Sequence, residues 1–137
     1  MRSKRPWNNC CQDANTGHDG SLSTGHANSP EDMLSRLETM VLMGIEIPLP
    51  AIRRQIAYGI DVIVHLGRMR DRSRKVLQVL EILGYDSAVG EIRTRVLYEF
   101  EESGVDENGK IQGSLVKKAE ISRRKKLERA GYQMERE

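Results

Sequence analysis

The sequence predicts a mixed α and β domain in which two helices come first, several strands follow and one short helix comes last. Three observations support this prediction. Apolar residues recur at helical spacing in residues 30–59 and alternate with polar residues in residues 60–116. Residues 122–131 are rich in Lys and Arg and begin at a serine that can cap a helix. The length of 137 residues suits one compact domain.

The two expected helices have clear start and stop signals. Ser29 can act as the N-cap, and Pro30 suits the first position of a helix that Gly44 ends. Pro50 opens the second helix, and Gly59 ends it. Because aromatic residues make up only 4% of the chain, we expect a core of Leu, Ile, Val and Met.

The four expected strands cover residues 60–66, 75–83, 92–100 and 110–116. Residues 68–74, with Asp71 at their centre, form the first turn. Asn108 followed by Gly109 is a strong signal for a hairpin between the last two strands. The pattern does not say which strands pair in parallel.

Composition excludes several classes of protein. The formal net charge is +2, so the chain as a whole is not built to bind a polyelectrolyte. No apolar run approaches the ~18 residues needed to span a bilayer, and the first residues lack the apolar stretch of a secretory signal. The only cysteines, Cys10 and Cys11, are adjacent and cannot form a disulfide framework. We therefore expect a cytoplasmic protein.

One stretch nearly matches the phosphate-loop pattern GxxxxGK[ST]. It runs from Gly104 to Lys110, but Ile111 stands where a hydroxyl group would hold magnesium. Asp106 and Glu107 would repel phosphate, and the expected flanks are two strands rather than a strand and a helix. We interpret this stretch as a hairpin turn.

The densest group of polar side chains lies in residues 16–30, TGHDGSLSTGHANSP. Its glycines let the backbone approach a ligand, and its imidazoles can donate hydrogen bonds to phosphate oxygens or to water. The alternative is a solvated loop in which His18 and His26 have no function. These histidines could also be grouped with Cys10 and Cys11 as zinc ligands, but the spacing fits no recognised finger, so we expect no metal site.

The same loop resembles a known family. The stretch TGHDGSLSTGHANSP, followed by SRLETMVLMG and IPLPAIRRQIAYGIDVIVHLGRMRD, is similar to the His box and following region of the type II and type IV secretion ATPases. Within that family it resembles the CpaF type, which powers assembly of Flp (tight-adherence) pili. The resemblance runs from about residue 14 to the end. It implies an α/β fold, as the C-terminal part of a RecA-like P-loop NTPase domain.

The resemblance implies roles for six residues of the loop. Those implied to be catalytic, near the γ-phosphate, are His18, His26 and Thr24, and those implied to lie close to the nucleotide are Thr16, Gly17 and Ser23. The family's phosphate loop and acidic Walker B segment precede its His box, and neither motif precedes residue 16 here. We therefore expect residues 13–137 to form a partial motor domain, after an irregular lead of residues 1–12.

The resemblance also implies cofactors and partners. The complete family protein uses ATP and Mg²⁺ and assembles as a homo-hexamer. It works in the cytoplasm, peripheral to the inner membrane, with the platform proteins of a pilus or secretion system, and no specific nucleic acid is implied. Phosphoryl transfer depends on the loop lysine and magnesium. We therefore expect neither cofactor bound to this chain alone, and no ATP hydrolysis by it.

Three other features leave alternatives open. His65 lies in a strand pattern, where we expect a hydrogen-bonded structural histidine rather than a catalytic one. The arginines of residues 53–54 and 68–74 either contact a neighbouring subunit or its phosphates or form a solvated basic face. The tail of residues 117–137 has a formal charge of +4. The alternative function is a small non-enzymatic module that binds protein or nucleic acid through this tail.

Overall fold

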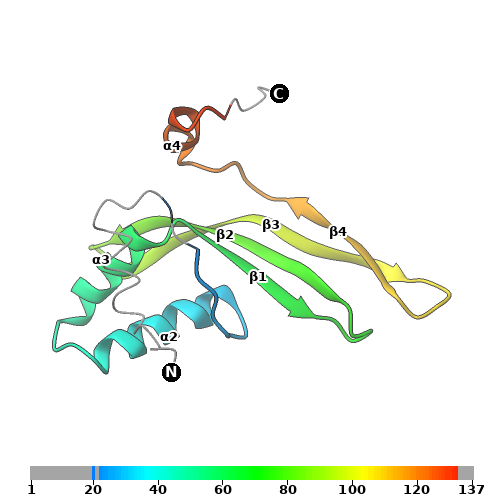
Figure 1. Cartoon of the computed structure of the whole chain (residues 1–137), viewed down its shortest axis with the longest axis horizontal. Coiled ribbons are helices and arrows are strands. Elements are labelled where there is room, and N and C mark those ends of the chain that lie inside the picture. Colours follow the sequence, from blue (N-terminus) through cyan, green and yellow to red (C-terminus); the bar gives the residue numbers. More distant parts are fainter. Residues whose placement is uncertain (1–19, 21, 133–137) are drawn as a thin grey trace, which may run out of the picture.

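The computed structural model describes residue 20 and residues 22–132. Within this part of the chain the elements are, in order, α2 (Pro30–Leu42), α3 (Leu49–Gly59), β1 (Val62–Arg68), β2 (Arg74–Asp86), β3 (Glu91–Val105), β4 (Ile111–Lys117) and α4 (Arg124–Arg129) (Figure 1). The predicted order of two helices, four strands and one helix is confirmed. The irregular lead of residues 1–12 lies outside the described residues.

Helix α2 begins as the sequence predicts. Ser29 Oγ accepts a hydrogen bond from the backbone N–H of Asp32 at 3.0 Å, which satisfies one of the free donors of the first turn. The helix ends at Leu42, two residues before Gly44, and Met43 closes it by donating its N–H to the carbonyl of Thr39. Its buried face consists of Pro30, Leu34, Leu37 and Val41.

Helix α3 packs against α2 and the sheet through Ile52 and Ile56, which are both fully buried. Arg53 adds a polar link between three elements. Its Nε donates to Glu38 Oε1 of α2 at 2.8 Å, and its Nη1 donates to the carbonyl of Gly90, before β3, at 2.7 Å. The hydrogen bond to Glu38 raises the pKa of Arg53. Arg53 therefore has a structural role in this chain.

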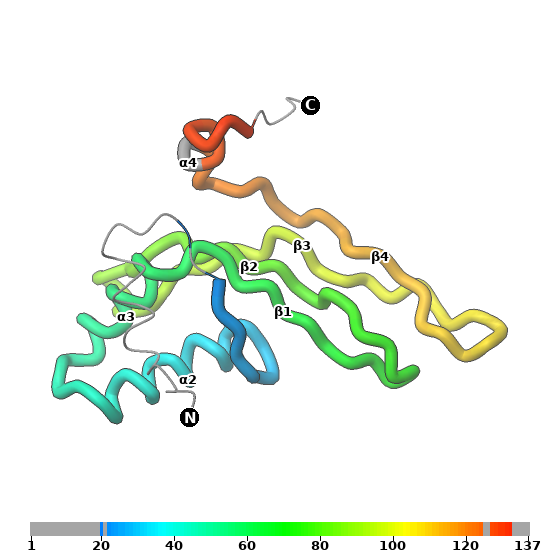
Figure 2. The backbone as a smooth tube through the Cα atoms, viewed as in Figure 1, coloured from blue at the N-terminus to red at the C-terminus, as the bar shows by residue number. Residues whose placement is uncertain are grey.

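The four strands form one sheet in the order β1-β2-β3-β4, and each neighbouring pair is antiparallel. The pairing that the sequence leaves open is thus a simple meander, in which β2 and β3 run along the middle (Figure 2). Two strands are longer than predicted. β2 continues to Asp86 and β3 to Val105, because backbone pairing with the neighbouring strand extends past the residues with alternating polarity.

The two faces of the sheet have different partners. Leu80 and Ile82 of β2 belong to the same buried cluster as the apolar residues of α2 and α3. Glu81 lies between them in the strand and so points to the opposite face. Figure 1 shows α2 and α3 on one side of the sheet and α4 on the other.

Glu81 anchors the C-terminal segment to that second face. Its side chain is 0% exposed, and Oε1 accepts from the N–H of Ser122 at 3.0 Å and from Ser122 Oγ at 2.8 Å. Arg123 pairs with Asp61, just before β1. This corrects the sequence prediction for the last helix, in which Ser122 was the N-cap of residues 122–131. Ser122 Oγ is bonded to Glu81 rather than to the helix, and α4 covers only Arg124–Arg129.

No helix in residues 22–132 combines the length and the apolar character needed to cross a membrane.

Candidate functional site

The candidate site is the loop that leads into α2. Ser23, Thr24 and His26 are exposed and lie in a segment without regular secondary structure. The structure therefore brings these three side chains together within one short, accessible loop. The other predicted site residues, Thr16, Gly17 and His18, lie outside the described residues.

Polar contacts fix the end of this loop to the first turns of α2. Asp32 Oδ2 accepts from the N–H of Asn28 at 3.0 Å, while the N–H of Asp32 donates to Ser29. Arg36, one turn further on, pairs with Asp32 at 3.4 Å and donates from Nη1 to the carbonyl of His26 at 3.0 Å. The backbone next to His26 is thus held on the helix while its imidazole stays exposed.

The donors of this loop match the chemistry of an anion. Hydroxyl groups of Ser23 and Thr24 and a ring N–H of His26 can each donate to a phosphate oxygen. The N-terminus of α2 carries a partial positive charge nearby, which the carboxylates of Glu31 and Asp32 in the first turn offset. The loop can therefore position or sense a phosphate group, and residues 22–30, its described part, contain no carboxylate that could act as a base.

A shallow open groove of about 400 Å³ lies beside the start of α2. Ser29 and Pro30 form part of its wall, and His65 of β1 and Met69 line it as well. The other lining residues are Leu77, Gln78, Glu99, Phe100 and Glu102. The groove joins the helix start to the carboxyl end of β1. The sequence did not predict it, because its residues come from four separate segments.

His65 differs from its predicted role. It is half-buried on the face that lines the groove, and its ring takes part in no hydrogen bond among the described residues. The hydrogen bond expected for this histidine is therefore not formed within the described part of the chain. The period-two pattern of β1 was a usable signal, since it places His65 on the same face as Ile63.

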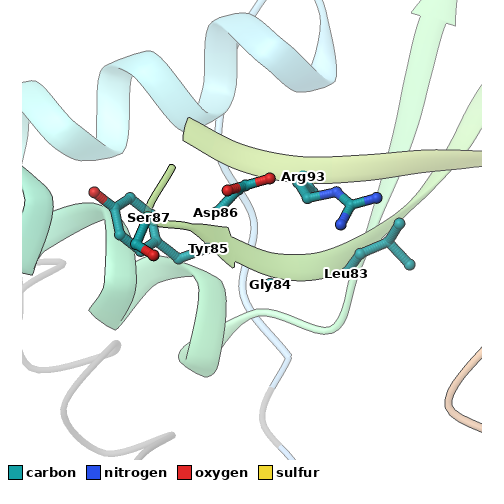
Figure 3. Close-up of a pocket in the computed structure, with 6 residues that line it drawn as sticks. All are labelled: Leu83, Gly84, Tyr85, Asp86, Ser87 and Arg93. Carbon is teal, nitrogen blue, oxygen red and sulfur yellow. The ribbon is translucent and has the colours of Figure 1, made fainter. Parts of the chain in front are cut away.

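A second shallow pocket, of about 340 Å³, lies at the end of β2 (Figure 3). Tyr85 and Ser87 lie toward one end of the group and Leu83 and Arg93 toward the other. Between them, Asp86 Oδ1 accepts from the N–H of Ala88 at 3.0 Å. This carboxylate therefore shapes the turn into β3, and we assign the pocket no catalytic role.

The near-match to a phosphate loop is a hairpin, as the sequence indicates. Asp106 Oδ1 accepts from the N–H groups of Asn108 at 2.9 Å and Lys110 at 2.7 Å. Gly109 has a φ of 74°, a left-handed value that glycine adopts at little cost. The backbone donors of this turn face a carboxylate of the chain itself, so the turn connects β3 to β4 and does not form a phosphate cradle.

ATP and Mg²⁺ differ in how well the described residues suit them. The loop hydroxyls, the imidazole and several arginines supply donors for phosphate oxygens. For a metal ion held by protein side chains alone, the described ranges contain no group of three His, Cys, Asp or Glu residues. Cys10, Cys11 and His18 lie outside these ranges. We therefore derive no metal-dependent step from this chain.

Comparison with known proteins identifies the family. A family model described as "Type II/IV secretion system protein" matches residues 2–125. The match covers most of the 137 residues, so the chain belongs to the type II/IV secretion system protein family.

Two relatives from Mycobacterium tuberculosis are named "Putative conjugal transfer protein", one from strain CDC 1551 / Oshkosh and one from strain ATCC 25618 / H37Rv. Each is 32% identical to this chain over 65 residues, which is 47% of this chain. The aligned part spans only 18% of each relative's length.

Proposed function

We propose that this chain supplies the His-box part of the motor domain of a hexameric secretion ATPase of the CpaF type, which powers pilus assembly or protein secretion. The observation that supports this proposal most is the family match over residues 2–125. In this proposal the chain corresponds to the C-terminal part of a RecA-like P-loop domain. The complete protein binds ATP and Mg²⁺ and works at the cytoplasmic side of the inner membrane with platform proteins.

The contacts of the loop support a role in sensing the γ-phosphate. Arg36 and Asp32 hold the backbone around His26 and Asn28, so the exposed imidazole starts from a defined position. A preorganised donor of this kind stabilises charge that develops on a phosphate during transfer. His26 and Thr24 are the residues we assign to this role in the described part of the loop, with Ser23 as a polar neighbour.

The experiment that tests the proposal compares His26→Ala with Asn28→Ala in the complete ATPase that contains this segment. We expect kcat for ATP to fall about a hundredfold in His26→Ala, because one positioned donor is lost. The dissociation constant for ATP should change little. Asn28→Ala is a matched control in the same exposed loop and should keep its turnover. Unchanged turnover in His26→Ala would show that the loop is only a scaffold.

The alternative function, a small module that binds through the basic tail, is not favoured by the ion pairs of that tail. Lys117 and Arg124 both pair with Glu120, and Lys118 pairs with Glu101. Arg123 pairs with Asp61. Four of the eight basic residues of the tail are therefore engaged in ion pairs within the chain.

A further inference from the structure

The second face of the sheet, opposite to α2 and α3, is covered only in part by the described residues. The C-terminal segment lies over the part around Glu81, where Ser122 donates to that carboxylate. Val62, Val64 and Leu66 of β1 are exposed. Because Val62 is the register partner of Glu81 and side chains alternate along a strand, all three point to the second face.

Two valines of β2 widen this apolar surface. Val79 is the register partner of Val64, and Val76 is that of Leu66, so both lie on the second face, where they are half-buried. We call these valines and the three exposed residues of β1 the β1 patch. β1 is an edge strand of the sheet, and the outer N–H and C=O groups of an edge strand can pair with another strand. The β1 patch therefore has the features of an interaction surface.

Arginines continue the β1 patch toward the turn between β1 and β2. Arg68 follows Leu66 by two positions and is the register partner of Arg74, so both side chains leave the second face. Arg68, Arg72 and Arg74 are exposed, and among the described residues they form no hydrogen bond, ion pair or ring contact. Like charges directly opposite each other destabilise a sheet. A carboxylate of a partner would convert the repulsion between Arg68 and Arg74 into attraction.

The turn holds Arg72 in a costly backbone conformation. Its φ is 66°, in the left-handed region that glycine adopts at little cost and other residues adopt rarely. Asp71 closes the turn by accepting from the N–H of Ser73 at 2.9 Å, and within the described ranges it pairs with none of these arginines. The turn is therefore ordered while its positive charge stays available to a partner.

The covered part of the second face indicates the chemistry of such a partner. Where the C-terminal segment meets the sheet, the sheet supplies carboxylates and the segment supplies cations, since Arg123 pairs with Asp61 and Lys118 pairs with Glu101. At the β1 patch the sign is reversed, because there the sheet supplies arginines. A segment that covers the β1 patch therefore needs apolar side chains and carboxylates.

We propose that the β1 patch binds an extended acidic segment of a partner protein, which pairs with the outer edge of β1. The apolar side chains of the segment lie beside Val64 and Leu66. Its carboxylates accept hydrogen bonds from Arg68 and Arg74, with Arg72 at the end of the segment, and the fork of a guanidinium group matches a carboxylate. Because the β1 patch and the groove lie on opposite faces of the sheet, this binding goes beyond the proposed function.

A second copy of the chain fits the β1 patch less well than such a segment. Pairing of two β1 strands would cover the apolar side chains. It would not supply an acidic partner for Arg68, because β1 contains no carboxylate. A membrane surface would contact the arginines and the apolar side chains, but it would leave the backbone groups of the β1 edge without strand partners. A peptide segment satisfies all three requirements.

The test uses the 137-residue chain and two fluorescein-labelled synthetic peptides, with binding followed by fluorescence anisotropy. In both peptides Val alternates with Thr. The acidic peptide has Glu in place of the first two Val residues, since antiparallel pairing brings the first residues of the peptide beside Arg68. The basic peptide has Lys at these positions. We expect the acidic peptide to bind and the basic peptide not to bind.

Variants of the arginines locate the binding surface. Arg68→Gln and Arg74→Gln should each bind the acidic peptide about tenfold more weakly, because each loses a charge-assisted hydrogen bond. Without the peptide neither variant should melt below the unmodified chain, since each relieves the repulsion. Arg72→Gly should melt at a higher temperature and still bind more weakly, because glycine adopts the left-handed conformation at little cost.

Arg54→Gln is the matched control. Arg54 is exposed on α3, on the helix-covered side of the sheet, so this variant loses the same charge and should bind the acidic peptide normally. The proposal is wrong if the unmodified chain does not bind the acidic peptide or binds both peptides equally. It is also wrong if Arg68→Gln binds normally or if Arg54→Gln loses as much affinity as Arg68→Gln.

Two further measurements separate the other occupants. If the chain binds phosphatidylglycerol vesicles through Arg68 but does not bind the acidic peptide, the β1 patch contacts a membrane and the proposal is overturned. If Arg68→Gln abolishes self-association but leaves peptide binding unchanged, the occupant is a second copy. Because no step of this assay involves ATP, its result is independent of the outcome of the His26→Ala experiment.

Discussion

At the scale of single residues, Glu81 is the clearest case of a buried charge that the fold satisfies. Its carboxylate is 0% exposed between the core residues Leu80 and Ile82. Burying a charge is costly unless donors replace the lost water. Here the donors come from Ser122 and from the N–H of Arg123, which are more than 40 residues away in the chain. The C-terminal segment is thus part of the folded unit.

We predict that Glu81→Gln lowers the free energy of unfolding by about 2 kcal/mol, because hydrogen bonds to a charged acceptor are lost. Urea unfolding followed by circular dichroism measures this change. Glu107→Gln, at an exposed position in the β3–β4 turn, is the control and should change the free energy by less than about 0.5 kcal/mol. Proteolysis within residues 119–132 should also become faster in Glu81→Gln. Equal effects of the two substitutions would contradict the anchoring role.

The ionisation of Asp71 predicts that the stability of the fold depends on pH. The hydrogen bonds from Ser73, and then the one from Ile111, hold the pKa of Asp71 well below its ordinary range. A carboxyl group with a lowered pKa stabilises the fold above its unfolded-state pKa of about 4 and loses this contribution as pH falls through the folded-state value. The melting temperature of Asp71→Asn should therefore lie furthest below that of the unmodified chain at neutral pH.

The difference in melting temperature between Asp71→Asn and the unmodified chain should decrease once the pH falls below about 4 and continue to decrease in stronger acid. Asp86→Asn is the matched control, since this carboxylate also accepts a hydrogen bond in a turn but only from Ala88 at 3.0 Å. If the difference in melting temperature between Asp71→Asn and the unmodified chain stays constant from neutral to acid pH, ionisation of Asp71 does not contribute to stability.

At the scale of elements, the sequence predicts features that depend on neighbouring residues. It does not predict features that depend on contacts between residues far apart in the chain. Ser29 and Pro30 predicted the start of α2 correctly, because capping depends on neighbouring residues. Ser122 looks like a cap for the same local reason, but its hydroxyl bonds to Glu81. The loop donors were predictable because they are contiguous in sequence. The groove with His65 was not, since it forms only when the helix start packs beside the sheet.

The two edge strands differ in a way that bears on association. β1 exposes Val62, Val64 and Leu66, at 37%, 52% and 66%, and has no charged side chain before Arg68. On β4, Leu115 is 40% exposed among mainly polar neighbours. Uncharged apolar edge strands promote pairing with another chain, and charged residues prevent it. β1 is therefore the edge through which we expect the isolated chain to associate.

We predict that Val64→Lys increases the monomeric fraction of the isolated chain, because a charge on β1 disfavours contact with another apolar surface. Leu115→Lys makes the same change on β4 and should leave the distribution unaltered. Light scattering after size-exclusion chromatography measures both. If the unmodified chain is already monodisperse, or if the two variants behave alike, β1 is not the associating edge.

At the scale of the whole molecule, two basic regions differ in how far their charges are paired within the chain. The turn between β1 and β2 is basic and largely unpaired, whereas four basic residues near the C-terminus, Lys117, Lys118, Arg123 and Arg124, are paired with acidic partners. Net charge alone, at +2, conceals this difference.

The hairpin at residues 104–110 supports the prediction that the chain by itself does not hydrolyse ATP. Phosphoryl transfer needs a phosphate cradle, a lysine and magnesium to neutralise developing charge. The one stretch that resembles a phosphate loop is a hairpin whose N–H groups bond to Asp106. Purified chain should therefore release no phosphate from ATP above background, with or without Mg²⁺. His26→Ala prepared in the same way is the control, because residual activity common to both preparations comes from contaminants. Mg²⁺-dependent turnover that this substitution abolishes would show that the chain is an enzyme on its own.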